Sequence, residues 1–202
     1  MGTYHRAREN TERKIQEAYW SLFEKGEDKK ATVQDVCDLA GINRSTFYLH
    51  YRNLDEVFGA IKDRQMSLLK KLFDSTDRSN VDYNYFIPEL EMLYDSNERY
   101  LLPLVIEYKD PQFAKEYRDY MCERMQEDLG FEFDHDDPVA SAITKVIVKE
   151  MVDLHWESLH YHIASLEIID RISNGIFNIG LRRALKDDFG ITVGFDRMQK
   201  AP

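Results

Sequence analysis

The sequence has little of what a β-rich, secreted or membrane-embedded protein needs. Nine glycines and five prolines among 202 residues favour a helix-rich fold over a β-rich one. Cys37 and Cys122 are too few for a disulfide framework. No apolar run approaches the roughly 18–20 residues of a membrane-spanning helix, and the first ten residues lack the apolar core of a signal peptide. We therefore expect an all-α, cytoplasmic protein that makes no membrane contact.

Motifs for catalysis and for cofactor binding are also missing. The sequence has no nucleophile elbow, no P-loop and no dinucleotide-binding fingerprint. His155, His160 and His162 lie close together, but no cysteine or carboxylate completes a metal-ligand spacing with them. The acidic segment 134–137 does not follow the EF-hand pattern. We therefore expect no enzymatic activity, no cofactor and no metal site.

Positive charge is scarce overall, with a formal net charge of −10, and it is unevenly distributed. Residues 1–53 carry nine Lys and Arg against eight Asp and Glu, a balance of +1, so residues 54–202 hold the remaining −11. DNA responds first to the local surface of a protein. The N-terminal part is therefore compatible with DNA binding of modest nonspecific affinity.

The stretch from Thr32 to Asn53 has the pattern of two short helices joined by a turn. Thr32 is a good N-cap, and Asp35 follows three residues later, as in a capping box. Gly41 suits a left-handed C-cap, and Asn43 can cap a second helix that is rich in hydrogen-bonding side chains. The pattern is typical of a DNA-binding helix-turn-helix, but three packed helices of any small α-domain would also produce it.

Residues 11–62 resemble the N-terminal domain of the tetracycline-repressor (TetR) family. The matching positions, at the family's usual spacing, are Ala18, Leu22, Phe23, Gly26, Thr32, Val33, Asp35, Val36, Ala40, Gly41, Ile42, Ser45, Thr46, Phe47, Tyr48, His50, Tyr51 and Asn53. The resemblance implies a three-helix DNA-binding domain over residues 1–53 and a larger helical domain for effector binding and dimerisation over 54–202. The family usually has a phosphate-binding lysine where this chain has Leu54, so that contact is missing or moved to Arg52.

The candidate DNA contacts lie on the two helices of this stretch, the second of which we expect over 44–51, in the major groove. Arg44 is the candidate for base readout, because a guanidinium can pair with both acceptors of a guanine. Leu49 could meet a thymine methyl group. The family resemblance implies that Tyr48 and His50 contact the DNA backbone. The remaining candidates carry hydroxyl or amide groups: Thr32, Gln34, Ser45 and Thr46.

Helical periodicity extends over most of the chain. It predicts a first helix from about residue 10 to Lys25, and further helices over about 54–73, 82–95, 97–109, 111–129, 138–159 and 165–187. Pro111 and Pro138 suit first turns of helices, and we place Pro88 in a first turn as well. Pro103 predicts a kink or a break.

The last two predicted helices are apolar over a wide arc, which indicates a dimer interface. Its candidate residues are Ile143, Ile147, Met151, Ile172, Ile176 and Ile179. In the TetR family these helices form a four-helix bundle across a two-fold axis, and such a homodimer would read a palindromic operator in double-stranded DNA. Burial inside the chain's own core is the alternative.

Aromatic residues gather in the middle helices, as they do around effector pockets in the TetR family, although core packing accounts for any single one. The pocket candidates are Phe86, Leu90, Tyr94, Tyr108, Tyr117, Met121 and Trp156.

The expected function is a dimeric repressor released from DNA by a small-molecule effector. The alternative is an activator or co-regulator whose C-terminal domain binds a partner protein. The end of the chain resembles a TetR subgroup that includes dihydroxyacetone-kinase regulators, which implies that alternative.

Overall fold

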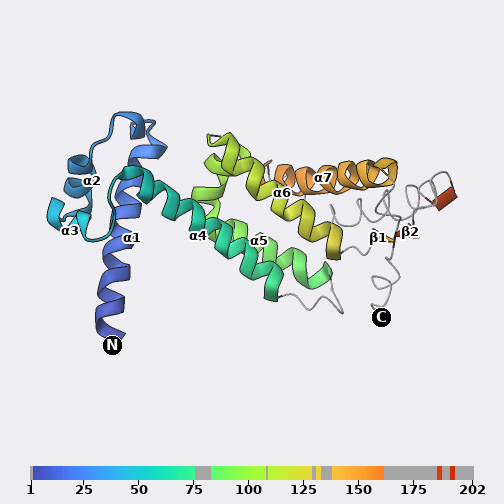
Figure 1. The fold of residues 1–202 in the computed structure, drawn as a ribbon, viewed down its shortest axis with the longest axis horizontal. Helices are drawn as coiled ribbons and strands as arrows, with labels where there is room; N and C mark the ends of the chain where they lie inside the picture. Colours follow the sequence, from blue (N-terminus) through green and yellow to red (C-terminus); the bar gives the residue numbers. More distant parts are fainter. Residues whose placement is uncertain are drawn as a thin grey trace. The chain divides into compact units, whose positions relative to one another are not determined.

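Helices make up nearly all of the described chain. The computed structural model describes residues 2–75, 83–107, 109–128, 131–132, 138–161, 186–187 and 192–193 (Figure 1). Its elements are α1 (Gly2–Glu24), the 3-10 turn η1 (Asp28–Lys30), α2 (Val33–Ala40), α3 (Arg44–Tyr48), α4 (Leu54–Ser75), α5 (Tyr83–Leu101), the π-helical turn η3 (Leu102–Ile106), α6 (Pro111–Asp128), β1 (Phe131–Glu132), α7 (Pro138–Tyr161) and β2 (Thr192–Val193). The two strands pair antiparallel over two residues each. The expected all-α class is confirmed.

None of the helices described has the length and apolar character that crossing a membrane requires. Contacts divide the chain into two compact units, Met1–Ser67 and Leu68–Pro202, with the division inside α4. The boundary expected from sequence lies instead at residue 53, where α4 begins. The contacts therefore assign the first part of α4 to the N-terminal unit.

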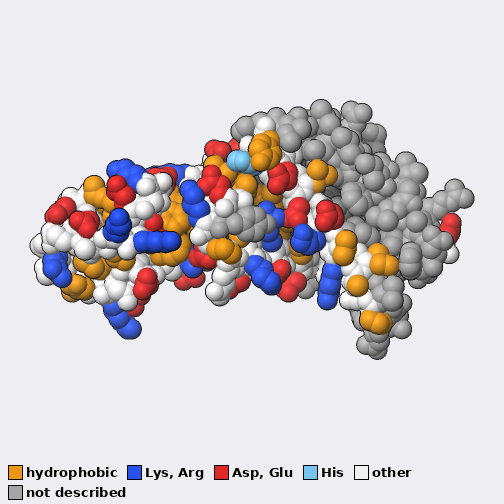
Figure 2. All heavy atoms as spheres, turned by 90° about the horizontal axis from the view of Figure 1, so that it is seen from above, with side chains coloured by type: hydrophobic (Ala, Val, Ile, Leu, Met, Phe, Trp, Pro, Cys, Tyr) orange, Lys and Arg blue, Asp and Glu red, His pale blue; other side chains and the backbone are white. Residues whose placement is uncertain are grey.

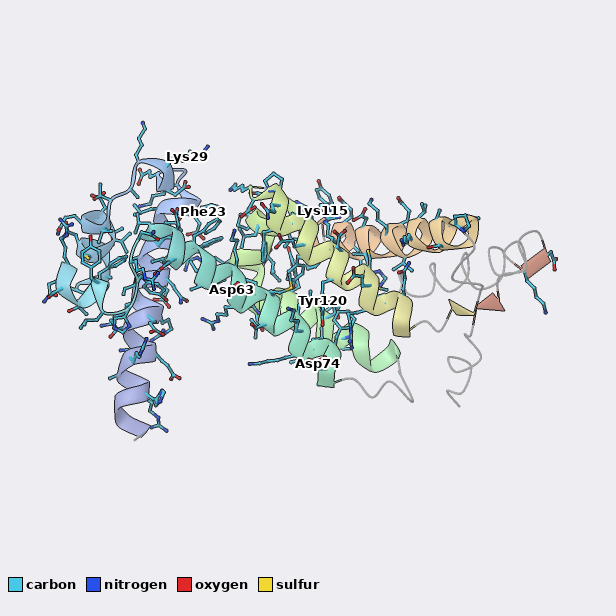
Figure 3. All side chains as sticks on the ribbon, in the orientation of Figure 1. Phe23, Lys29, Asp63, Asp74, Lys115 and Tyr120 are labelled. Carbon is cyan, nitrogen blue, oxygen red and sulfur yellow. The ribbon has the colours of Figure 1, made fainter. Side chains whose placement is uncertain are left out.

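The core of the N-terminal unit is built on the apolar stripe of α1, all of which is buried as the periodicity predicts: Ile15, Ala18, Tyr19, Leu22 and Phe23. Residues from α2, α3 and α4 close this core: Val36, Cys37, Phe47, Val57 and Ile61. The ring of Phe23 (labelled in Figure 3) lies 5.2 Å from that of Phe58, centroid to centroid. Burial of large apolar side chains is the main force that holds such a unit together.

The first helix begins at Gly2 and not near residue 10, so the expected start is wrong. Side-chain pairs one turn apart support the added turns. Arg8 Nε donates to Glu12 Oε1 at 2.9 Å, and Arg13 Nη2 donates to Asn10 Oδ1 at 2.9 Å. Pairs at this spacing stabilise an exposed helix by a few tenths of a kcal/mol each, roughly 0.2–0.5. No apolar period marks these residues, which explains why the sequence pattern misses them.

The turn between α2 and α3 follows the expected chemistry. Thr32 and Asp35 form the predicted capping box, and Gly41 ends α2 in the left-handed region with φ of 66°. Asn43 caps α3, as expected. The second helix, however, is shorter than the predicted 44–51: it ends at Tyr48, because the next two amide groups, of Leu49 and His50, bond three residues back and tighten the turn.

The C-terminal unit follows some of the helix boundaries predicted from its prolines. Pro111 and Pro138 open α6 and α7 as expected, and the break predicted at Pro103 is the π-helical turn η3. Pro88 lies inside α5 and not in its first turn. The predicted break near residue 96 is also wrong: α5 is continuous there, and Asn97 Nδ2 donates back to the Leu93 carbonyl at 2.8 Å. The helix expected over 165–187 lies outside the described residues except for 186–187.

Substitution of Gly41 tests the turn between α2 and α3, and substitution of Gly59, inside α4, is its control. Gly41→Ala places a side chain at a positive φ, although nothing lies within 4 Å of the added Cβ, and we expect it to lower the free energy of unfolding by about 1 kcal/mol. Gly59→Ala, inside α4 and equally uncrowded, is expected to raise it by about 0.5–1 kcal/mol. Urea unfolding followed by circular dichroism measures both. Equal stability of the two variants would contradict the left-handed cap.

Candidate functional site

The exposed side of α3 carries the predicted base-reading residue. The α3 face, defined by Arg44, Tyr48 and Leu49, is open to solvent, with Leu49 79% and Tyr48 50% exposed. Arg44 Nη2 donates to the Tyr48 hydroxyl at 3.2 Å, and the guanidinium lies 5.8 Å from the centroid of the Tyr48 ring. An Arg–aromatic contact of this kind holds the planar cation in one orientation. Arg44 is therefore pre-oriented on the α3 face.

Asn43 fixes the start of α3. Its Oδ1 accepts hydrogen bonds from the Ser45 hydroxyl at 2.6 Å, from the Thr46 amide at 2.8 Å and from the Thr46 hydroxyl at 2.8 Å. The hydroxyl hydrogens of Ser45 and Thr46 are thus committed to the cap. Both residues lie where a DNA contact is expected, but neither can donate to a phosphate while this cap is formed.

The start of α2 is similarly occupied. The Thr32 hydroxyl donates to Asp35 Oδ2 at 2.7 Å, and Gln34 Nε2 donates to Asp38 Oδ1 at 2.7 Å. Hydrogen bonds from the Thr32 side chain and backbone hold the pKa of Asp35 below its ordinary value. An ionised carboxylate beside the α2 N-terminus opposes the approach of a phosphate. The geometry thus gives Thr32 a capping role.

His50 and Tyr51 are held by α1, which the sequence pattern does not reveal. His50 Nδ1 lies 3.1 Å from Glu12 Oε1, and Gln16 Nε2 donates to the Tyr51 hydroxyl at 2.8 Å. The side chain of His50 is only 10% exposed. Residues 12 and 16 are far from 50 and 51 in the chain, so no local spacing predicts these pairs. Leu54, where the TetR family usually has lysine, is the half-exposed first residue of α4.

Positive and negative side chains are mixed on the described surface (Figure 2). The face of the molecule in Figure 2 shows Lys and Arg interspersed with Asp and Glu over the described residues. A groove of about 520 Å³ in the N-terminal unit is lined by residues of α1 and α4: Arg6, Glu9, Asn10, Glu12, Arg13, Gln16 and Arg64. This pattern agrees with the near-neutral balance of residues 1–53.

In the C-terminal unit, most of the pocket candidates are buried. Leu90 and Tyr94 of α5, Tyr117 and Met121 of α6, and Trp156 of α7 are almost fully inaccessible. The Trp156 ring lies 5.7 Å from that of Tyr94 and 5.8 Å from that of Tyr117, so the three rings form one aromatic cluster. The side chain of Phe86 and the whole of Tyr108 lie outside the described residues.

The polar atoms of the aromatic cluster are unsatisfied. In the part of the chain that the structure describes, the hydroxyls of Tyr94 and Tyr117 and the Nε1 of Trp156 have no hydrogen-bond partner. Burial raises the pKa of Tyr94 to about 12 and raises that of Tyr117 further, so both phenols stay neutral. Each buried polar group without a partner costs about 1–3 kcal/mol. The cluster therefore holds three neutral donors that have no acceptor among the described residues.

A second hollow, which sequence patterns do not indicate, lies between α6 and α7. This groove of about 420 Å³ is lined by Lys115, Arg118, Asp119, Cys122, Glu123, Gln126, Lys145, Lys149 and Asp153. Asp153 accepts hydrogen bonds from both Arg118 and Lys149. Burial raises the pKa of the Cys122 thiol to about 11, so this cysteine is not a reactive thiolate at neutral pH.

The dimer candidates are only partly described. Val148, Val152 and Trp156 form the buried side of α7, whereas Val146 is 59% exposed and Leu154 is exposed as well. Ile143 is half-buried, and the side chains of Ile147 and Met151 lie outside the described residues, as do Ile172, Ile176 and Ile179. One side of α7 thus keeps apolar side chains in solvent in the single chain.

In the described ranges, no group of three or more His, Cys, Asp or Glu side chains is placed to hold a metal ion. His162, the third member of the histidine group considered in the sequence, lies outside those ranges.

Comparison of the chain with models of protein families, with curated proteins and with solved structures finds no match.

Two tyrosines with opposite hydrogen-bonding states provide a test of the aromatic cluster. Tyr117→Phe removes a buried hydroxyl that has no partner, so we expect an unchanged free energy of unfolding or a gain of up to about 1 kcal/mol. Tyr51→Phe strands the Gln16 amide and is expected to cost about 1 kcal/mol. Chemical unfolding measures both. A Tyr117→Phe variant destabilised as much as Tyr51→Phe would show that the Tyr117 hydroxyl is satisfied.

Proposed function

We propose that this chain is a dimeric transcriptional regulator of the TetR type, which binds a palindromic operator through a helix-turn-helix formed by α2 and α3. The observation that carries the proposal is the α3 face. Arg44 is exposed at the start of a helix that Asn43 caps, and Tyr48 orients its guanidinium. A guanidinium presented in this way can pair with the O6 and N7 acceptors of a guanine in the major groove.

Contacts to the DNA backbone would come from the same side of the unit. Tyr48 is half-exposed, and His50 follows two residues later. Arg52, whose side chain is exposed, is placed beside the start of α4 and can replace the missing lysine at position 54. Such contacts position the protein without reading sequence. The hydroxyls of Ser45 and Thr46 are secondary, because the cap uses their hydrogens.

Dimerisation would use α7. The exposed Val146 and Leu154 leave apolar area that a second copy can cover, together with the isoleucines predicted for the last helix. A two-fold dimer places two α3 faces on matched half-sites of a palindrome.

Regulation would act through the C-terminal unit. The unsatisfied donors of Tyr94, Tyr117 and Trp156 favour a neutral effector with hydrogen-bond acceptors. Such an effector would release DNA by stabilising a dimer with a different spacing of the two α3 faces, provided that it binds the two states unequally. A partner protein bound to this unit is the alternative. Titration of small molecules and candidate partners, followed by fluorescence of Trp20 and Trp156, distinguishes the two.

Binding of the purified protein to DNA from upstream of its own gene, across a salt series, tests the proposed function. We expect affinity above that for random duplex, falling steeply with salt because phosphate contacts release counterions. Arg44→Ala should weaken specific binding by about tenfold to a hundredfold, since a good bidentate pair contributes about 1–3 kcal/mol.

Arg99→Ala is the matched control, because it removes the same charge from α5 in the C-terminal unit. It should leave operator affinity within about twofold of the wild type. Equal losses in the two variants would mean that net charge alone, and not the α3 face, determines binding. Retention of full specific affinity by Arg44→Ala would refute the assignment of Arg44.

A further inference from the structure

Glu12 lies against His50 and sets the position of its ring hydrogen. His50 Nδ1 is 3.1 Å from Glu12 Oε1, and the same oxygen accepts a hydrogen bond from Arg8 Nε at 2.9 Å. The Glu12 side chain is 29% exposed and that of His50 10% exposed, so the pair is largely shielded from water. This contact between α1 and His50, two residues after the end of α3, restricts the hydrogen bonds that His50 can form with a ligand.

The protonation state of Glu12 determines whether it accepts or donates the hydrogen bond with His50. Burial raises the pKa of Glu12, but the hydrogen bonds and charges of Arg8 and His50 outweigh this effect and hold the pKa below its ordinary value. Glu12 is therefore ionised at neutral pH, and an ionised carboxylate only accepts hydrogen bonds. The hydrogen between the two residues must then reside on Nδ1 of His50.

This arrangement fixes the chemistry of the other ring nitrogen. In a neutral imidazole with hydrogen on Nδ1, Nε2 carries a lone pair and can only accept. Nε2 has no hydrogen-bond partner among the described residues. Phosphate oxygens also only accept, so a neutral His50 held by Glu12 cannot bond to a DNA backbone. Protonation adds a hydrogen to Nε2 and turns it into a charged donor.

We propose that Glu12 is a positioning residue that makes the DNA contact of His50 depend on protonation, so that operator binding tightens as the pH falls. The inference rests on the proposed DNA-binding function and adds its regulation by pH. The sign follows from linkage: the bound state holds a proton on His50 that the free neutral state lacks, so binding takes up a proton from solvent.

Charged groups on the neighbouring elements do not replace Glu12 in this role. Arg8 lies one turn before Glu12 on α1 and donates a hydrogen bond to its carboxylate. Arg52, after His50, is paired with Glu56 of α4 at 3.6 Å. On α2, the carboxylates are engaged with Thr32 and Gln34. The other charged residues that share the groove of Glu12 are Arg6, Glu9, Arg13 and Arg64.

Glu12→Gln keeps the shape of the side chain and removes the constraint. An amide can donate its N–H to Nδ1, which lets a neutral His50 carry its hydrogen on Nε2 and contact phosphate without taking up a proton. Removing a negative charge also raises affinity for DNA at every pH, so the readout is the slope of affinity against pH and not the affinity itself.

The experiment is fluorescence anisotropy of labelled operator with the full-length protein, between pH 5.5 and pH 8.5 at constant ionic strength, with random duplex as reference. For the wild type we expect specific affinity about fivefold or more tighter at pH 6 than at pH 8, with uptake of up to about one proton per subunit. In Glu12→Gln and in His50→Gln this ratio should fall to about twofold or less. His5→Gln, which removes another histidine of α1, should keep the wild-type ratio.

A flat wild-type profile would overturn the proposal, and so would a Glu12→Gln variant that keeps the wild-type slope. Wild-type protein without specific binding at any pH would refute the proposed function itself and this inference with it. Nitrogen NMR of the histidine rings in the free protein gives an independent readout. Neutral His50 should carry its hydrogen on Nδ1 in the wild type, and hydrogen on Nε2 would overturn the proposal without any DNA present.

Discussion

The geometry of the proposed DNA interface depends on one side-chain oxygen, Oδ1 of Asn43. It accepts three hydrogen bonds from the first turn of α3, which is otherwise too short to be stable alone. Gly41, two residues earlier, supplies the left-handed turn that brings Asn43 into place. With the start of α3 fixed in this way, Arg44 points outward and Tyr48, one turn later, can hold its guanidinium.

The other end of α3 is anchored by α1. Phe47 is buried under the helix, and Gln16 and Glu12 reach across to Tyr51 and His50. A five-residue helix is thus held by a cap, a core side chain and two polar contacts. Pre-organised contacts of this kind reduce the ordering that binding would otherwise require. One of these contacts brings a negative charge with it: the carboxylate of Glu12 lies beside His50, which is the proposed contact to a DNA phosphate.

Sequence reasoning succeeded where the physical cause is local. The capping box of Thr32, the turn at Gly41 and the first-turn prolines Pro111 and Pro138 all follow from residues within one helical turn. It failed where distant contacts or a balance of weak preferences decide: the early start of α1, the continuity of α5 and the pairing of Glu12 with His50 across 38 residues. The polar residues near the helix starts were recognisable from sequence as possible DNA contacts. The hydroxyl hydrogens of Thr32, Ser45 and Thr46 are used in capping, which depends on the folded geometry and not on spacing in the sequence.

Selection of bound duplexes from a random-sequence library with the purified wild-type protein tests whether two α3 faces read a palindrome. We expect enrichment of one palindromic site, with a guanine in each half-site and centres of the half-sites separated by about one helical turn of DNA or a multiple of it. Recovery of sequences with no shared site, or of a single unrepeated half-site, would contradict it.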